Sequence, residues 1–96
     1  MKVLANGQYT NSVTGQTLLA ATAAGTAPPV IKQIRITVTG TMLVNIYQGS
    51  DANGSRLVYD SLDKGLSENY PDPIAVTGAL LISTTGTGTT YVTLYG

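Results

Sequence analysis

The strongest constraint on the fold is a two-residue alternation of apolar and polar side chains. In VIKQIRITVTG, residues 30–40, the apolar side chains of Ile34, Ile36 and Val38 are separated by polar ones. This period is typical of a β-strand with one buried and one solvated face. The same alternation resumes in TMLVNIYQ, so we predict two strands joined as a hairpin at 39–41.

Similar strand patterns fill most of the remaining chain. SRLVYDSL, residues 55–62, reads as another strand, and IAVTGALLIST and TGTTYVTLYG predict two more, separated by a hairpin loop at 86–88. The segment 63–73 contains two prolines and most of the acidic residues, which predicts a surface loop between sheets. For 16–24 the composition allows a helix or a strand, and the surrounding strands favour the strand.

These elements together define the expected fold class. Seven or eight short strands with Gly-rich turns predict an all-β protein, a small antiparallel β-sandwich whose order, jelly-roll or Ig-like, is left open. A chain of 96 residues makes one domain, 1–96. As an alternative to including them in the sandwich, the first 29 residues form a partly extended N-terminal arm. The AGTAPP segment, 24–29, is then its hinge.

Two segments of the chain match each other. TGTMLVNIY, residues 39–47, and TGTTYVTLY, residues 87–95, align at a constant offset of 48, from Thr39 to Thr87. Reuse of the same turn chemistry and an internal duplication both explain the match. In either case we expect two hairpins in similar places, one in each sheet.

The charged residues exclude several functions. Five Lys and Arg balance five Asp and Glu, which leaves no basic surface for nucleic acid or an anionic membrane. His is absent, so the usual general base and imidazole metal ligand are missing. The carboxylates of Asp60, Asp63, Glu68 and Asp72 crowd around one predicted loop, which favours a solvated connection over a glycosidase pair. We therefore expect no enzyme activity and no cofactor.

The chain also lacks cysteine, so its stability must come from packing or self-association. At the N-terminus only Val3, Leu4 and Ala5 are apolar before Asn6, far fewer than the roughly 7–15 residues of a secretory signal. No apolar run reaches the about 20 residues that cross a bilayer. We expect a soluble protein with no secretion signal and no membrane partner.

One segment could be mistaken for a metal site. DANGS, residues 51–55, places oxygen-bearing side chains at alternate positions, as a calcium loop does. Gly stands fourth rather than sixth, however, and Leu62 occupies the place of the bidentate Glu. Asn53-Gly54 is a preferred pair for a tight turn, so a turn is favoured and no metal is predicted.

The aromatic residues are six Tyr with neither Trp nor Phe. Tyr combines an apolar body with a polar tip and is enriched at protein interfaces. The alternation places some of these side chains on the face opposite the predicted core. The interface candidates are Leu43, Tyr47, Tyr91, Thr93 and Tyr95.

Several segments resemble a known class of protein. VNIY at 44–47, GSDANGS at 49–55, the Pro-rich approach at 70–74 and GTTYVTLY at 88–95 together are similar in style to small all-β virion structural proteins of tailed bacteriophages. That class includes capsid decoration, head-fibre and tail-associated proteins. The resemblance implies a homo-oligomer, with a trimer favoured, that binds the major capsid protein or another virion protein, assembles in the host cytoplasm and resides in the virion.

An alternative function is a carbohydrate-binding or adhesin module. In this reading Tyr91 and Tyr95 stack on sugar rings, and Asp51, Asn53 or Asp72 bind sugar hydroxyls. An outward aromatic platform beside a groove favours this alternative, whereas a packed Tyr seam between subunits favours assembly.

Overall fold

The described chain is all-β. The computed structural model describes residues 2–49 and 55–96, with side chains described at 2–49, 56–66 and 73–96. These residues form one antiparallel sheet of six strands and no helix. The strands are β1 (Val3–Thr10), β2 (Val13–Leu19), β3 (Val30–Gln48), β4 (Ser55–Leu62), β5 (Leu66–Ala75) and β6 (Leu80–Tyr95).

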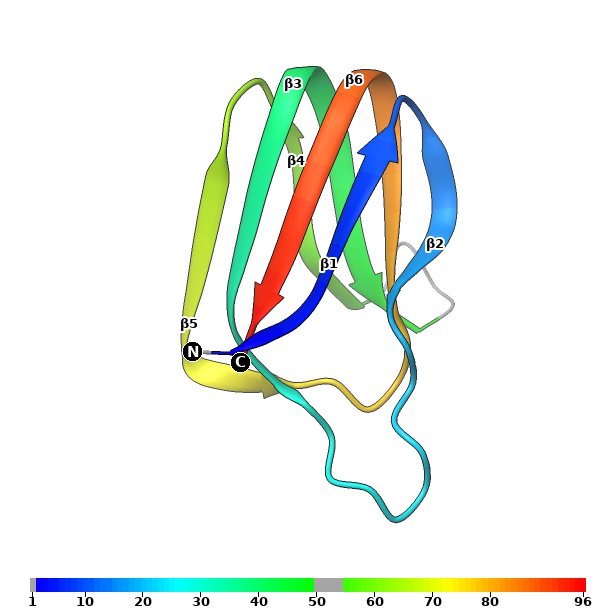
Figure 1. Ribbon diagram of the computed structural model, residues 1–96, viewed down its shortest axis with the longest axis vertical. Helices are drawn as coiled ribbons and strands as arrows, with labels where there is room; N and C mark the ends of the chain where they lie inside the picture. The colour runs from blue at the N-terminus through cyan, green and yellow to red at the C-terminus, as the bar shows by residue number, and fades with distance from the viewer. Residues whose placement is uncertain (1, 50–54) are drawn as a thin grey trace.

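Two long strands, β3 and β6, form the centre of the sheet. They pair without a bulge from Gln33 opposite Tyr95 to Gln48 opposite Leu80. Both strands bend over at the top of the molecule, so that one half of the sheet lies in front of the other (Figure 1). The hairpins predicted at 39–41 and 86–88 are therefore wrong, because at both places the chain bends within a continuous strand.

Glycines make the bend because the two backbones approach closely there. Gly40 lies opposite Gly88 and has a φ of 78°, and Gly88 has a φ of 141°. Both values lie in the region that L side chains rarely adopt. A Cβ at Gly88 would collide with the carbonyl oxygen of Thr39, and one at Gly40 would lie 2.7 Å from that of Thr87.

The bend divides the sheet into two half-sheets. The front half-sheet contains β1, the last part of β6, the first part of β3 and β5 (Figure 1). The back half-sheet contains β2, the first part of β6, the last part of β3 and β4. The inner sides of both halves supply the core: Ile34 and Val92 from the front half-sheet and Val44 and Ile82 from the back are at most 1% exposed.

The two repeated segments start opposite each other at the bend, where Gly40 pairs with Gly88, and then run into opposite half-sheets. Ile34 pairs with Leu94, and the residues 48 positions away from each, Ile82 and Ile46, also pair. The flanking strands follow the same scheme, since β1 and β2 pair with β6 while β4 and β5 pair with β3. The match thus relates two adjacent strands by an approximate two-fold axis between Gly40 and Gly88. It does not mark two separate hairpins.

Other expectations change with the topology. The predicted loop at 63–73 is wrong over most of its length, because β5 begins at Leu66 and pairs with β3. In the 16–24 segment the strand alternative holds as far as Leu19. Residues 3–19 of the proposed N-terminal arm pair with β6 in the sheet. A sandwich of seven or eight strands is not confirmed, because two predicted pairs of short strands are the single strands β3 and β6.

Candidate functional site

The outer side of the front half-sheet carries polar side chains around one exposed tyrosine. Side chains directly opposite each other on paired strands project to the same side. Tyr91 on β6 lies between Thr37 on β3 and Gln8 on β1, and its side chain is 43% exposed. The residues that we call the front face are Asn6, Gln8, Arg35, Thr37, Tyr91, Thr93 and Tyr95.

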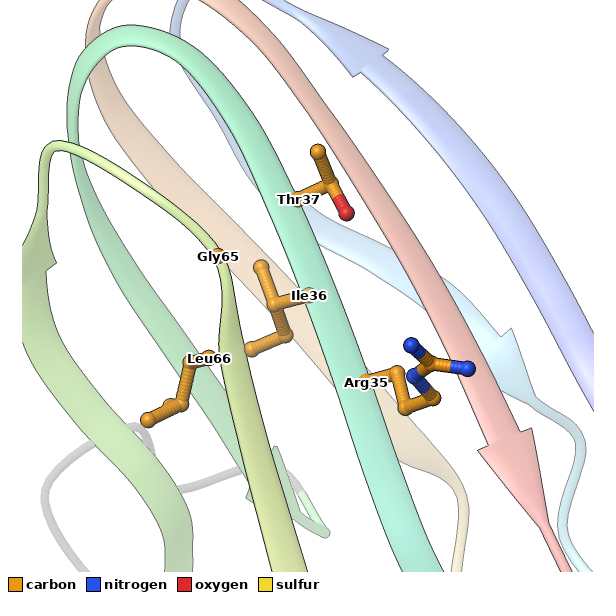
Figure 2. A pocket seen from close by; sticks show the side chains of 5 residues that line it. All are labelled: Arg35, Ile36, Thr37, Gly65 and Leu66. Atoms are coloured by element: carbon orange, nitrogen blue, oxygen red, sulfur yellow. The ribbon is translucent and has the colours of Figure 1, made fainter.

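A shallow hollow of about 170 Å³ adjoins the front face. It is lined by Arg35, Ile36, Thr37, Gly65 and Leu66. Figure 2 shows Arg35 and Thr37 projecting from one side of β3, whereas Ile36 projects from the other side. A Cβ at Gly65 would lie 3.3 Å from the carbonyl oxygen of Ile36, so glycine keeps this side of the hollow open. The volume is below the about 300–1,000 Å³ of most small-molecule pockets.

The charge of the front face is positive. Arg35 is exposed and makes no hydrogen bond or ion pair with another described residue. None of the residues that define the front face is acidic. Arg35 is therefore available to an anionic group that approaches from solvent.

The outer side of the back half-sheet has a different composition. Asn45 on β3 lies between Ser83 on β6 and Tyr59 on β4. Tyr59 is 51% exposed, and the guanidinium carbon of Arg56 lies 3.9 Å from the centre of its ring. The residues that we call the back face are Leu43, Asn45, Tyr47, Tyr59, Leu81 and Ser83.

Tyr47 is almost completely buried on the back face. Its side chain is 4% exposed, and its Oη lies 3.2 Å from Ser83 Oγ. The N–H of Gly15 donates to the same Ser83 Oγ at 3.0 Å. Gly15 has a φ of 58° at a register shift of β2, and a Cβ there would lie 3.6 Å from Tyr47 Oη. The irregular part of β2 thus packs beside the tyrosine, and its Gly15 N–H donates to the same Ser83 Oγ that contacts the tyrosine hydroxyl.

The predicted interface residues do not form one surface. Leu43 and Tyr47 lie on the back face, and Tyr91, Thr93 and Tyr95 lie on the front face. Leu43, Thr93 and Tyr95 are partly exposed. A single planar contact cannot include all five residues.

Sequence reasoning missed the neighbours of Tyr91. Gln8 and Asn6 reach the front face because β1 pairs with β6, and the sequence showed no signal for that long-range pairing. Arg35 did carry a signal, because it occupies a polar position in the alternation that placed Ile34 and Ile36 in the core.

The other candidate residues form no site among the described side chains. Asp60 and Asp63 are exposed, and Asp60 Oδ1 accepts a hydrogen bond from the Ser61 N–H at 2.8 Å. Among the side chains described at 2–49, 56–66 and 73–96, His, Cys, Asp and Glu form no group that could hold a metal ion. Asp51 and Asn53 lie outside the described residues, as do the side chains of Glu68 and Asp72. In the described part of the chain no helix is long and apolar enough to span a membrane.

Comparisons with protein-family models, with curated proteins and with solved structures find no match for this chain.

Proposed function

We propose that this protein is a non-enzymatic structural component of a bacteriophage particle, a capsid decoration (cement) protein or another virion-surface protein. It acts by self-association and by binding the repeated lattice of the particle. The proposal rests on the resemblance of its sequence to small phage virion proteins. As part of it, we regard the doubled sheet as a small β-sandwich, with a jelly-roll or Ig-like order as a prediction.

The observation that carries the proposal is the back face. Tyr59 is 51% exposed there, beside Leu43 and Leu81, which are partly exposed. Interfaces are rich in Tyr and poor in Lys, Asp and Glu, and the back face contains none of these three charged residue types. A chain of 96 residues without disulfides also gains stability when it buries such a surface against another copy.

The geometry favours one of the two faces as the contact. The front and back faces point away from each other across the core. Association that used both would join copies head to tail in an open stack, whereas contacts confined to one face can form a closed assembly. We therefore place the contact on the back face, in a closed homo-oligomer for which the resemblance favours a trimer.

The test is the mass of the purified protein by light scattering coupled to size exclusion, over a range of concentrations. We expect an oligomer that Leu43→Asp dissociates without unfolding, because a carboxylate would be buried in the contact. Tyr91→Asp is the matched control on the front face and should leave the mass unchanged. A monomer at every concentration would refute self-association, and a loss of mass only in Tyr91→Asp would move the contact to the front face.

A second candidate function is recognition of a surface glycan. The observation that favours it is the exposed ring of Tyr91, flanked by Gln8 and by Thr37, which also lines the hollow. An aromatic ring can stack on the apolar side of a sugar while amide and hydroxyl groups bind its hydroxyls. Binding of soluble oligosaccharides to the monomeric Leu43→Asp variant tests this function separately from assembly.

A further inference from the structure

We propose that the front face binds an acidic sugar, with the sugar ring on Tyr91 and its carboxylate on Arg35. The inference rests on the second candidate function and specifies its ligand. It assigns Arg35, Thr37 and the hollow beside Gly65 to the binding site. None of these residues belongs to the back face.

The spacing of the strands sets the size of the ligand. Thr37 lies directly opposite Tyr91, and Arg35 is two positions further along β3, opposite Thr93. Diagonal neighbours of this kind are about 7–8 Å apart, within reach of long side chains. A sugar ring on Tyr91 can therefore extend a carboxylate to Arg35. On the other side of Tyr91, the amide of Gln8 faces the hydroxyls of the same ring.

Electrostatics favour a carboxylate over a neutral group. Arg35 has no described partner, and none of the residues that define the front face is acidic. The planar guanidinium can donate two parallel hydrogen bonds to one carboxylate, which a neutral sugar cannot match. Because Arg35 is exposed, salt will screen this contact, so binding should be measured at low ionic strength.

Other anionic ligands fit less well. A protein that binds nucleic acid contacts several phosphates with Lys and Arg side chains, whereas the front face has one Arg and no Lys. The face therefore matches a glycan that carries one carboxylate on a ring.

The experiment compares trigalacturonic acid with its methyl ester, in which the rings are the same and the charge is removed. Chemical shifts of ¹⁵N-labelled protein are followed at low salt. We expect the acid to shift signals of β3 and β6 around Arg35 and Tyr91. The affinity for the ester should be lower than the affinity for the acid by a factor of at least about ten. Arg35→Gln should lower the affinity for the acid to the affinity for the ester. The affinity for the ester itself should not change.

Two further variants complete the test. Tyr91→Ala should lower the affinity for both ligands, because both stack on the aromatic ring of Tyr91. Lys32→Gln removes one exposed positive charge from the same strand and should weaken binding of the acid much less than Arg35→Gln does, through its long-range field alone. Equal binding of acid and ester, lost in Tyr91→Ala but not in Arg35→Gln, would overturn the carboxylate site and leave glycan recognition standing. Absence of binding by both ligands would overturn the proposed site, and if the Leu43→Asp variant also binds no other oligosaccharide, the second candidate function falls with it while the assembly role stays untouched.

Discussion

The front and back faces place matched residues in different surroundings. The offset of 48 that relates β3 to β6 also relates Leu43 to Tyr91 and Tyr47 to Tyr95. Yet Tyr47 is 4% exposed, whereas Tyr95 is partly exposed and Tyr91 is 43% exposed. Similar sequence on two strands thus leaves Tyr47 covered on the back face and its match, Tyr95, partly exposed on the front face.

The difference comes from the flanking strands. On the back, β2 departs from regular pairing at Gly15 and packs beside Tyr47, whose hydroxyl meets Ser83. On the front, β1 pairs with β6 in a steady register from Ala5 to Thr10 and leaves Tyr91 exposed. Burial on a sheet face therefore depends on how the neighbouring strand pairs, which the alternation of the central strand does not encode.

The largest expected effect removes the bend that both faces share. Gly88→Ala should lower the free energy of unfolding by about 4 kcal/mol, because backbone strain adds to a collision with the Thr39 carbonyl oxygen. Gly25→Ala is the control, since Gly25 also has a positive φ, 82°, but a Cβ there would meet nothing within 4 Å. Gly25→Ala should lower the free energy of unfolding by about 1–2 kcal/mol. Urea denaturation followed by circular dichroism measures both, and equal losses would show that close approach of the strands does not hold the bend.

The bend also marks the limit of what the sequence could predict. The two-residue period correctly placed Ile34 and Ile36 in the core, because that period depends only on the local geometry of a strand. It could not separate a hairpin from a bend, since glycine with positive φ serves both. The pairing of Gly40 with Gly88 joins residues that are far apart in the sequence, so a local pattern does not reveal it.

The candidate site was predictable to a similar extent. The outward position of Tyr91 followed from alternation alone, and its side chain is exposed. The burial of Tyr47 did not follow, because it depends on Gly15, which is distant in sequence. The partners Asn6 and Gln8 were hidden for the same reason.

The second largest effect tests the contrast between the faces directly. Tyr47→Ala should cost about 3–4 kcal/mol, because it removes a buried ring and leaves a cavity. Tyr91→Ala should cost less than about 1 kcal/mol, because its ring is already 43% exposed. Denaturation of both variants at a concentration where the protein is monomeric provides the measurement. Similar losses would mean that the rings of Tyr47 and Tyr91 are equally buried in the monomer.

A smaller effect isolates the hydroxyl that separates the matched tyrosines. Tyr47→Phe removes the contact with Ser83 Oγ and should cost about 1 kcal/mol. Ser83 Oγ still accepts from the Gly15 N–H in this variant. Tyr95→Phe, at the matched position on the front face, should change stability by less than about 0.5 kcal/mol. An equal cost at both positions would contradict the role assigned to β2.

The smallest expected effect concerns Tyr9, whose side chain packs against the core inside the front half-sheet rather than on its outer face. Burial raises the pKa of Tyr9 above its ordinary value of 10.0, because the charged phenolate loses solvation. The unfolded chain therefore ionises first as pH rises, and the contribution of Tyr9 to stability is full below pH 10.0 and is lost at higher pH. Denaturation midpoints measured from neutral to alkaline pH should fall less steeply in Tyr9→Phe than in the unmodified chain. Parallel pH profiles would show that Tyr9 is as solvated in the folded chain as in the unfolded one, and that β1 does not press it onto the core.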